Sequence, residues 1–161
     1  MMAERDVKDV FRSFPSGVSV VTVGQGGVEG GLTISWASPV SFDPPLFMIS
    51  VHQHHYSREL IDRTEGFVVN VLKQGQERLA KHFAKQSFTD ADKLDPIPHR
   101  EGENGSAILT EALAYFDCRV LARYVHGDHV VYIGQVTDAA VQGEGEPLMA
   151  GAHLRYVPRS A

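Results

Sequence analysis

The residue types that could do chemistry in this chain are concentrated in one stretch, which runs from Gly31 to Leu46. Four hydroxyl residues surround the single tryptophan, Trp36, and a diproline follows them: Thr33, Ser35, Ser38, Ser41, Pro44 and Pro45. Proline fixes its backbone φ angle, so the diproline sets the direction in which the chain enters the next strand. The residues alone leave two interpretations open: a polar, ordered crossing between strands, or a cradle whose backbone and hydroxyl groups face a planar polar ring.

Three histidines follow within four positions, His52, His54 and His55. Imidazole is a common zinc ligand, so a metal site is one interpretation of this spacing. Neighbouring side chains of a segment that leaves a strand point apart, however, and no carboxylate or thiol stands at a ligand-like spacing nearby. The sequence therefore predicts no metal site here, and favours histidines that face solvent or a phosphate.

Two further classes of site are excluded by spacing. The glycines from Gly24 to Gly31 do not match the dinucleotide fingerprint, and the pattern predicts that they join strand to strand, whereas the fingerprint requires a helix next. Serine, histidine and aspartate are all present, but no nucleophile-elbow sequence is. We expect neither a Rossmann or phosphate loop nor a hydrolase.

The elements that must position these residues are mostly short strands. Apolar residues at Val7, Val10, Phe11 and Phe14 predict one face of an N-terminal helix that Pro15 and Gly17 end. Two further helices are expected, one with Ser57 as N-cap and one over 76–83. Strands are expected over 18–23, from about Leu32, and over 46–51, 67–72, 115–122, 130–136 and 153–157, with a hairpin turn in the glycines between the first two and a loop over 95–105. Such a series predicts a mainly β, antiparallel barrel with a few flanking helices.

Composition sets the wider limits. The 161 residues fit one domain over 1–161. The net charge is −5 and no cluster of Lys and Arg is present, so the sequence predicts no nucleic-acid partner. No apolar run reaches the roughly 18 residues of a membrane helix, and the charged start is unlike a signal peptide. Cys118, the single cysteine, lies in an alternating stretch and is expected to be buried and structural. We expect a cytoplasmic protein without a membrane partner.

Six pieces of the chain together resemble the flavin reductase-like, FMN-binding split β-barrel family, and they occur in that family's order. The stretch from Gly31 to Leu46 resembles its Thr-x-Ser segment, which leads through a serine-containing turn into Asp-Pro-Pro-Leu. The other pieces are 14–23, 67–72, 76–84, 127–129 and 147–148. The resemblance covers nearly the whole chain and implies an antiparallel split barrel.

It also implies the chemistry. The cofactor would be FMN, with FAD as an alternative, and NADH or NADPH would be the hydride donor. Two subunits would form an isologous homodimer with the flavin at their interface, and reduced flavin could serve a partner oxygenase or another electron acceptor. The implied flavin-binding residues are Thr33, Ile34, Ser35, Trp36, Ser38, Pro39, Val40, Ser41, Ser50, Val51, His52, His55, Ser57, Arg58, Phe83, Ala84 and Lys85.

Within that set, Thr33, Ser35, Trp36 and the 38–41 turn would meet the edge of the ring, while 83–85 would lie along the same cofactor. Ser57 and Arg58, with His52 or His55, would hold the phosphate at a helix start. Asp128, His129 and His153 would meet the nicotinamide, with His129 as the catalytic candidate that guides the nicotinamide or a proton. A histidine simply held in a turn by Asp128 is the alternative for His129.

Two departures from the family pattern leave the function open. Trp36 stands where many members have a second serine, and with Ser35, Tyr56 and Ser57 it is more similar to the flavoredoxin-type branch. Near the end, 151–153 stands where many members have Gly-x-Tyr. The alternatives are therefore an electron carrier that binds FMN without efficient NAD(P)H oxidation, and a protein that stores flavin or binds another ligand such as haem. Only the histidines of 52–55 support the last of these.

Overall fold

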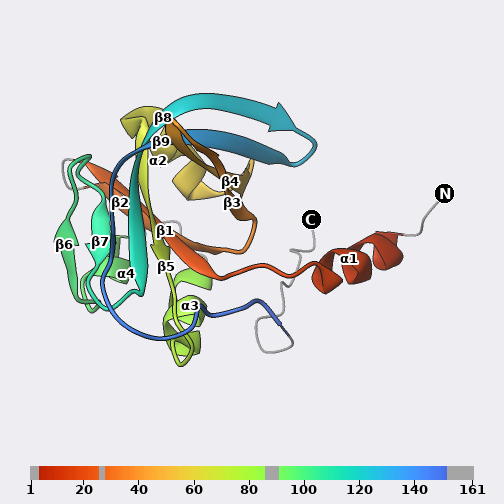
Figure 1. The fold of residues 1–161 in the computed structure, drawn as a ribbon. Helices are drawn as coiled ribbons and strands as arrows, with labels where there is room; N and C mark the ends of the chain where they lie inside the picture. Colours follow the sequence, from red (N-terminus) through yellow and green to blue (C-terminus); the bar gives the residue numbers. More distant parts are fainter. Residues whose placement is uncertain (1–3, 26–27, 86–90, 152–161) are drawn as a thin grey trace.

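The computed structural model describes residues 4–25, 28–85 and 91–151, and they form a strongly curved antiparallel sheet with helices around it (Figure 1). Seven strands make the main sheet: β1 (Ser19–Gln25), β2 (Val28–Ile34), β3 (Ala37–Phe42), β4 (Pro45–His52), β5 (Gly66–Val71), β8 (Ala114–His126) and β9 (His129–Val141). Two short strands, β6 (His99–Glu101) and β7 (Ala107–Leu109), pair separately. The predicted mainly β, antiparallel architecture is confirmed.

The order of the strands explains why the sheet closes. It runs β2-β1-β5-β8-β9-β4-β3, so β2 and β3 are its two edges. These edges are consecutive in the chain, because only Ser35 and Trp36 separate the end of β2 from the start of β3. A sheet whose outermost strands are joined by so short a link must curl until its edges meet. Ser35 and Trp36 therefore lie at the split in the barrel.

Alternating side chains fill the interior. Along β4, Phe47, Ile49 and Val51 are buried, whereas the residues between them are partly exposed. These three pack with Val21, Leu60, Phe67 and Tyr132 in the larger core cluster. Because side chains of a strand alternate between its two faces, the residues at 48, 50 and 52 lie on the outer face of the barrel.

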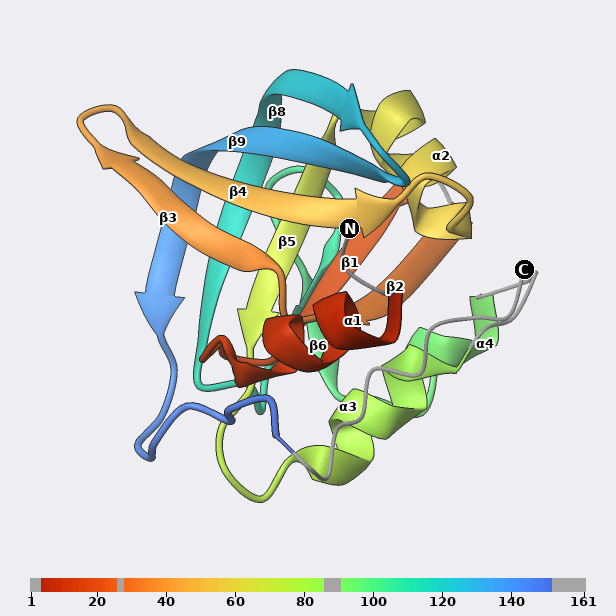
Figure 2. The same ribbon diagram turned by 90° about the vertical axis from the view of Figure 1, so that its right-hand side faces the viewer.

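Among the described residues, three helices of eight or more residues lie around the barrel (Figure 2): α1 (Glu4–Ser13), α2 (Tyr56–Thr64) and α3 (Glu77–Ala84). The expected N-cap of α2 was wrong by two residues. His55 occupies the cap with an extended backbone, and its Nδ1 accepts a hydrogen bond from the backbone N–H of Ser57 at 3.1 Å. An imidazole acceptor can satisfy an orphan N–H as a hydroxyl does, which composition rules for caps do not anticipate. A single helical turn, α4 (Ala91–Leu94), was not expected.

Three strand predictions need correction. The second strand begins at Val28 and not near Leu32, so Gly30 and Gly31 lie inside β2. The polar stretch after it contains a true strand, β3, and the region 95–105 is only partly a loop because β6 lies within it. The strand expected over 153–157 lies outside the described residues. The long strands β8 and β9 were placed correctly but underestimated in length.

Two expectations about individual features can be examined directly. Cys118 is fully buried, as predicted, and burial raises the pKa of its thiol to about 12. No helix in the described ranges has both the length and the apolar character needed to cross a membrane.

Candidate functional site

The outer face of β3, β4 and β9 brings together residues that are far apart in the sequence. Strand β4 pairs with β9 so that His52 lies opposite His129 and Ser50 lies opposite Val131. On its other side β4 pairs with β3, where Ser38 lies opposite Met48. The backbone N–H of Ser50 donates to the carbonyl oxygen of Trp36 at 2.9 Å, which fixes the backbone of the split against β4.

Four side chains form a cluster at the end of this face, and we refer to Trp36, His52, Asp128 and His129 as the Trp36–His129 cluster. The ring centroids of Trp36 and His129 are 4.8 Å apart, and those of His52 and His129 are 5.3 Å apart. The backbone N–H of Gln53 donates to the carbonyl oxygen of Asp128 at 2.9 Å, which holds the β8–β9 turn against the end of β4. The structure therefore joins predicted flavin residues to predicted nicotinamide residues.

Asp128 and His129 form a hydrogen-bonded pair with Nδ1 and Oδ1 2.7 Å apart. The hydrogen bond from His129 lowers the pKa of the Asp128 carboxyl below its usual range, and the charges of His129 and His52 act in the same direction. An ionised carboxylate can only accept, so we assign the proton to Nδ1 of His129. This assignment leaves Nε2 as the nitrogen that can exchange a proton with a bound molecule.

The predicted flavin-binding residues of β2, β3, β4 and the link between β2 and β3 differ in their surroundings. Ile34 and Val51 are buried in the core, so only their backbone atoms could contact a ligand. The Thr33 hydroxyl donates to the carbonyl oxygen of Ala80 at 2.6 Å and ties β2 to α3. The others are partly or fully exposed, namely Ser35, Trp36, Ser38, Pro39, Val40, Ser41 and Ser50.

The residues predicted to hold the phosphate are already buried or paired within the protein. Ser57 is completely buried, and its hydroxyl has no hydrogen-bond partner within the described chain. His55 caps α2, as described above. Arg58 is half-buried and pairs with Asp62 at 3.0 Å. A phosphate at this helix start would therefore have to share Arg58 with Asp62, and would reach the Ser57 hydroxyl only after that side chain turned outward.

The three predicted residues at the end of α3 are not equivalent. Phe83 is completely buried and packs on β2 beside Gly31, so its ring belongs to the core. Ala84 and Lys85 are exposed and remain open to a ligand. His153, the remaining nicotinamide candidate, lies outside the described residues.

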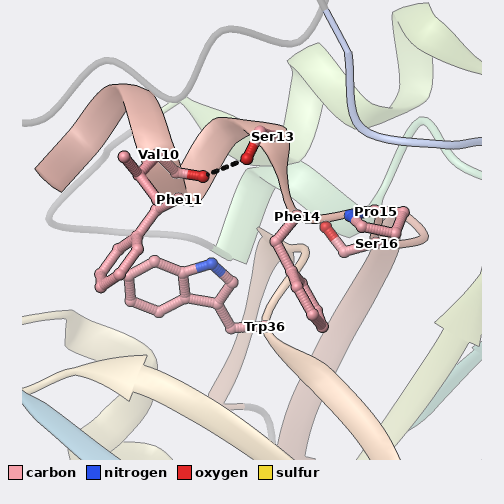
Figure 3. Close-up of a pocket in the computed structure, with 7 residues that line it drawn as sticks. All are labelled: Val10, Phe11, Ser13, Phe14, Pro15, Ser16 and Trp36. Atoms are coloured by element: carbon pink, nitrogen blue, oxygen red, sulfur yellow. Dashed lines mark hydrogen bonds between the residues drawn. The ribbon is translucent and has the colours of Figure 1, made fainter. Parts of the chain in front are cut away.

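Sequence reasoning missed the contribution of α1. A pocket of about 550 Å³ lies between this helix and the split, lined by Val10, Phe11, Ser13, Phe14, Pro15, Ser16 and Trp36 (Figure 3). Phe11 meets the indole of Trp36 edge to face, with ring centroids 6.0 Å apart. The apolar spacing of α1 was visible in the sequence, but periodicity does not show which surface an apolar face will cover.

The histidines at 52–55 lie in different surroundings in the structure. Within residues 4–25, 28–85 and 91–151, no three His, Cys, Asp or Glu side chains are arranged to hold a metal ion. His52 and His54 contact each other with ring centroids 5.7 Å apart, while His55 is turned to the cap of α2. The three histidines therefore do not converge on one point: His52 and His54 contact each other, whereas His55 caps α2.

The chain is similar in sequence and in fold to known proteins. The chain is 34% identical to a diflavin flavoprotein from Synechocystis over 94% of its length, but spans only 26% of that protein. It is 32% identical to the reductase component of a 4-nitrophenol monooxygenase from Rhodococcus opacus, over 95% of this chain and 81% of that one. The solved structure of an NADH:FAD oxidoreductase from Streptomyces globisporus superposes with a TM-score of 0.88 at 30% identity, covering 100% of this chain and 98% of that one.

The family model described as "Flavin reductase like domain" matches residues 11–157, a range that includes every strand of the barrel and the whole Trp36–His129 cluster. The chain therefore belongs to the flavin reductase-like domain family.

Proposed function

We propose that this protein is an NAD(P)H:flavin oxidoreductase that binds FMN, with FAD as an alternative, and passes reduced flavin or its electrons to a partner. The Trp36–His129 cluster carries the proposal, because it places a nicotinamide candidate within ring contact of a flavin candidate on one exposed face. The names of two relatives support the same function: one is an NADH:FAD oxidoreductase, and another is the reductase component of a monooxygenase.

The residues on this face fit a flavin ring. A flavin needs apolar contact for its faces and hydrogen-bonding groups at its edge. Trp36 supplies an aromatic surface that is 39% exposed. Ser35 and Ser50 are partly exposed beside the Trp36–Ser50 backbone hydrogen bond, and no hydrogen bond of either hydroxyl is seen among the described residues. When bound, the flavin supplies the chemistry by accepting a hydride and releasing electrons singly or in pairs.

The protein's own residues supply orientation. Hydride transfer needs the two reacting rings aligned and close, and it needs no side-chain nucleophile. His129 presents Nε2 to a bound molecule because Asp128 holds Nδ1, so His129 can orient the carboxamide of a nicotinamide or hold a proton beside it. Because His129 is paired with His52 on β4, the backbone of His129 is fixed relative to the split.

Hydroxyl and backbone donors at the split would act on the flavin. Donors at the ring edge stabilise the negative charge of reduced flavin, as donors placed toward developing charge do in other sites. Ser35 and Ser50 are the side chains placed to do so. The half-buried Arg58 is the described cation expected at the phosphate, and the exposed Lys85 would lie along the same cofactor.

We infer that two subunits form the working unit. The apolar face of α1 is strongly exposed in a single subunit, with Val10 at 60%, Phe11 at 56% and Phe14 at 74%. Together with Trp36 these side chains form a contiguous apolar surface around the pocket, and such surfaces mark interfaces. A second copy bound about a twofold axis would cover this surface and enclose a flavin at the split. Light scattering that finds a monomer still holding flavin would refute this part.

A flavoredoxin-type electron carrier is the second candidate, and one observation favours it. The indole of Trp36 already lies against His129, with ring centroids 4.8 Å apart, and His129 is the side chain on which a nicotinamide would depend. A carrier would bind flavin in the same place but would not be reduced efficiently by NADH or NADPH.

One experiment separates the candidates. The purified protein is loaded with FMN, and separately with FAD, and flavin absorbance is followed under anaerobic conditions after NADH or NADPH is added. Multiple turnovers with excess flavin support the reductase. Flavin that stays oxidised with both nucleotides but accepts electrons from dithionite supports the carrier. A protein that binds neither flavin contradicts both.

A further inference from the structure

The indole of Trp36 contacts aromatic rings from two distant parts of the chain, Phe11 on α1 and His129 on β9. Its ring centroid lies 6.0 Å from that of Phe11, with an interplanar angle of 81°, and 4.8 Å from that of His129, with an angle of 44°. The side chain is 39% exposed although it is the largest in the chain. Trp36 is therefore in ring contact with His129 while part of its side chain remains exposed to solvent.

The backbone beneath this side chain is fixed. The carbonyl oxygen of Trp36 accepts from Ser50, and β3 begins at the next residue, so the main chain is held by the sheet. Movement of the indole would thus be a rotation about its side-chain bonds. Exposed side chains make such rotations on fast timescales, and staggered rotamers provide discrete alternative positions.

The space for an alternative position is present. The pocket of about 550 Å³ is lined by the indole together with α1 and the residues that follow it, including Phe11 and Phe14 (Figure 3). Both rings offer the edge and face contacts that aromatic side chains prefer. An indole that left His129 could therefore keep apolar surroundings in this pocket, where it already contacts Phe11.

We propose that Trp36 is a gate: its indole covers the face of His129 where the nicotinamide ring binds, and it must swing toward α1 before the hydride donor can enter. This inference rests on the proposed function, because it concerns the nicotinamide side of the same site. In this role Trp36 controls the access of the nicotinamide, because the indole and the nicotinamide compete for one face of the His129 imidazole.

The gate would raise the apparent dissociation constant of the nucleotide. When only a fraction of molecules is competent, the apparent dissociation constant equals the intrinsic one divided by that fraction. If the indole covers His129 in about four of five molecules, removing it tightens nicotinamide binding about fivefold. If the Trp36 indole instead supported the bound nicotinamide, removing the indole would weaken nucleotide binding.

The single tryptophan allows the wild-type protein to report on itself. NAD⁺ is titrated into the protein at saturating flavin, because the oxidised nucleotide binds without reducing the flavin. The gate predicts a saturable change in the intensity and wavelength of tryptophan emission as the indole leaves His129. A binding isotherm by calorimetry with no accompanying change in emission would contradict it.

Two substitutions test the sign. Trp36→Ser is expected to lower the NAD⁺ dissociation constant and the KM for NADH about fivefold at saturating flavin, and Trp36→Phe is expected to lie between it and the wild type. Val141→Ser, which removes a 78% exposed apolar side chain at the far end of β9, is the matched control and should change neither constant. Unchanged or weaker nucleotide binding in Trp36→Ser overturns the gate.

The outcomes separate the gate from the function on which it rests. If the wild type oxidises NADH but Trp36→Ser binds no more tightly, only the gate fails. If the wild type neither binds NAD⁺ nor oxidises NADH, and Trp36→Ser gains both, the gate holds and the wild type is a carrier. If both proteins are inert to the nucleotide, the gate and the reductase fail together. Should Trp36→Ser not fold, Trp36→Phe and the emission of the wild type decide.

Discussion

The ring of Phe83 passes so close to Gly31 that a β-carbon on this glycine would lie 2.6 Å from the ring's Cδ1 atom and 2.8 Å from Cε1. Phe83 is completely buried between β2 and the rest of the smaller core cluster, so its ring has little room to withdraw. The contact holds α3 against the strand that leads into the split. It is the reason that a glycine is needed inside β2.

Gly31→Ala is therefore expected to destabilise the protein. Overpacking a filled core costs about 1–3 kcal/mol of the free energy of unfolding, which urea unfolding measures. The matched control is Gly143→Ala, because the nearest atom to a β-carbon there is the Lys73 Nζ at 3.7 Å. Equal stability of the two variants would show that Phe83 can move aside.

The fold could be predicted from the sequence wherever the pattern is local. β4 and β5 were placed within a residue because runs of Val, Ile and Phe need no tertiary information to indicate a buried strand. β3 was missed because its serines and proline lower strand propensity, and pairing with β4 overrides that preference. The start of β2 was missed because Gly30 and Gly31 are typical of turns, whereas here Gly31 makes room for Phe83.

The candidate site was predicted as a set of residues but not as an arrangement. Family resemblance supplied Trp36, His52 and His129, but their contact depends on the register between β4 and β9, which no local pattern contains. The contribution of Phe11 depends on where α1 docks, which is equally non-local. Ser57 illustrates the opposite error: a serine near a helix start suggested a surface cap, and His55 took that place while the serine was buried.

Tyr132→Phe tests the polar anchor of α2. The Tyr132 hydroxyl donates to the Asp62 carboxylate at 2.8 Å from a ring that is otherwise completely buried. Burial, with Asp62 beside it, raises the pKa of this hydroxyl, so it stays protonated. Removing it deletes one hydrogen bond to a charged group, for a loss of about 1.5–3 kcal/mol in the free energy of unfolding. Tyr124→Phe, at a 52% exposed position on β8, is the control that should change stability little.

Cys118 is expected to be unreactive until the protein unfolds. Its side chain is fully buried and burial raises the pKa of the thiol to about 12, so the nucleophilic thiolate is scarce at neutral pH. Labelling by a thiol reagent should therefore follow the urea unfolding transition, and Cys118→Ser should abolish it. Rapid labelling of the native protein would show that β8 and β9 open locally around this residue.

The buried Asp117 should make stability depend on pH. Desolvation raises the pKa of this carboxyl, although the backbone N–H of Glu103 donates to its Oδ2 at 2.8 Å; its Oδ1 has no partner within the described residues. In the window above the unfolded value, about 3.9, the folded state binds more protons than the unfolded state. This group's contribution to stability is therefore complete below that value and is lost as the pH rises through the raised folded pKa.

Asp117→Asn removes that titration and keeps an oxygen for the Glu103 N–H. Relative to the wild type, the variant should gain in the free energy of unfolding as the pH rises from about 4 toward neutrality. Urea unfolding at a series of pH values measures the difference, with the exposed Asp95→Asn as control. A constant difference across the series would mean that Asp117 titrates alike in both states.

The pair of Asp128 and His129 can be tested by its separate members. His129→Ala removes the side chain that would orient the nicotinamide, so kcat/KM for NADH should fall by about 10²-fold, within the range for a positioned acid or base. Asp128→Asn keeps His129 but replaces the ionised acceptor at 2.7 Å with an amide, whose oxygen can still accept from Nδ1. Its loss should be smaller, roughly tenfold, because the amide holds the ring with a weaker, uncharged hydrogen bond.

His99→Ala, an exposed histidine on β6, is the matched control and should retain the activity of the wild type. Flavin affinity is measured for every variant by fluorescence titration, so that a loss of hydride transfer is not mistaken for a loss of cofactor. If His129 were only a turn residue held by Asp128, both variants would lose stability in urea while kcat/KM at saturating flavin stayed unchanged. Because hydride transfer depends on alignment, a role in orientation must appear in the kinetic constants whether or not stability also changes.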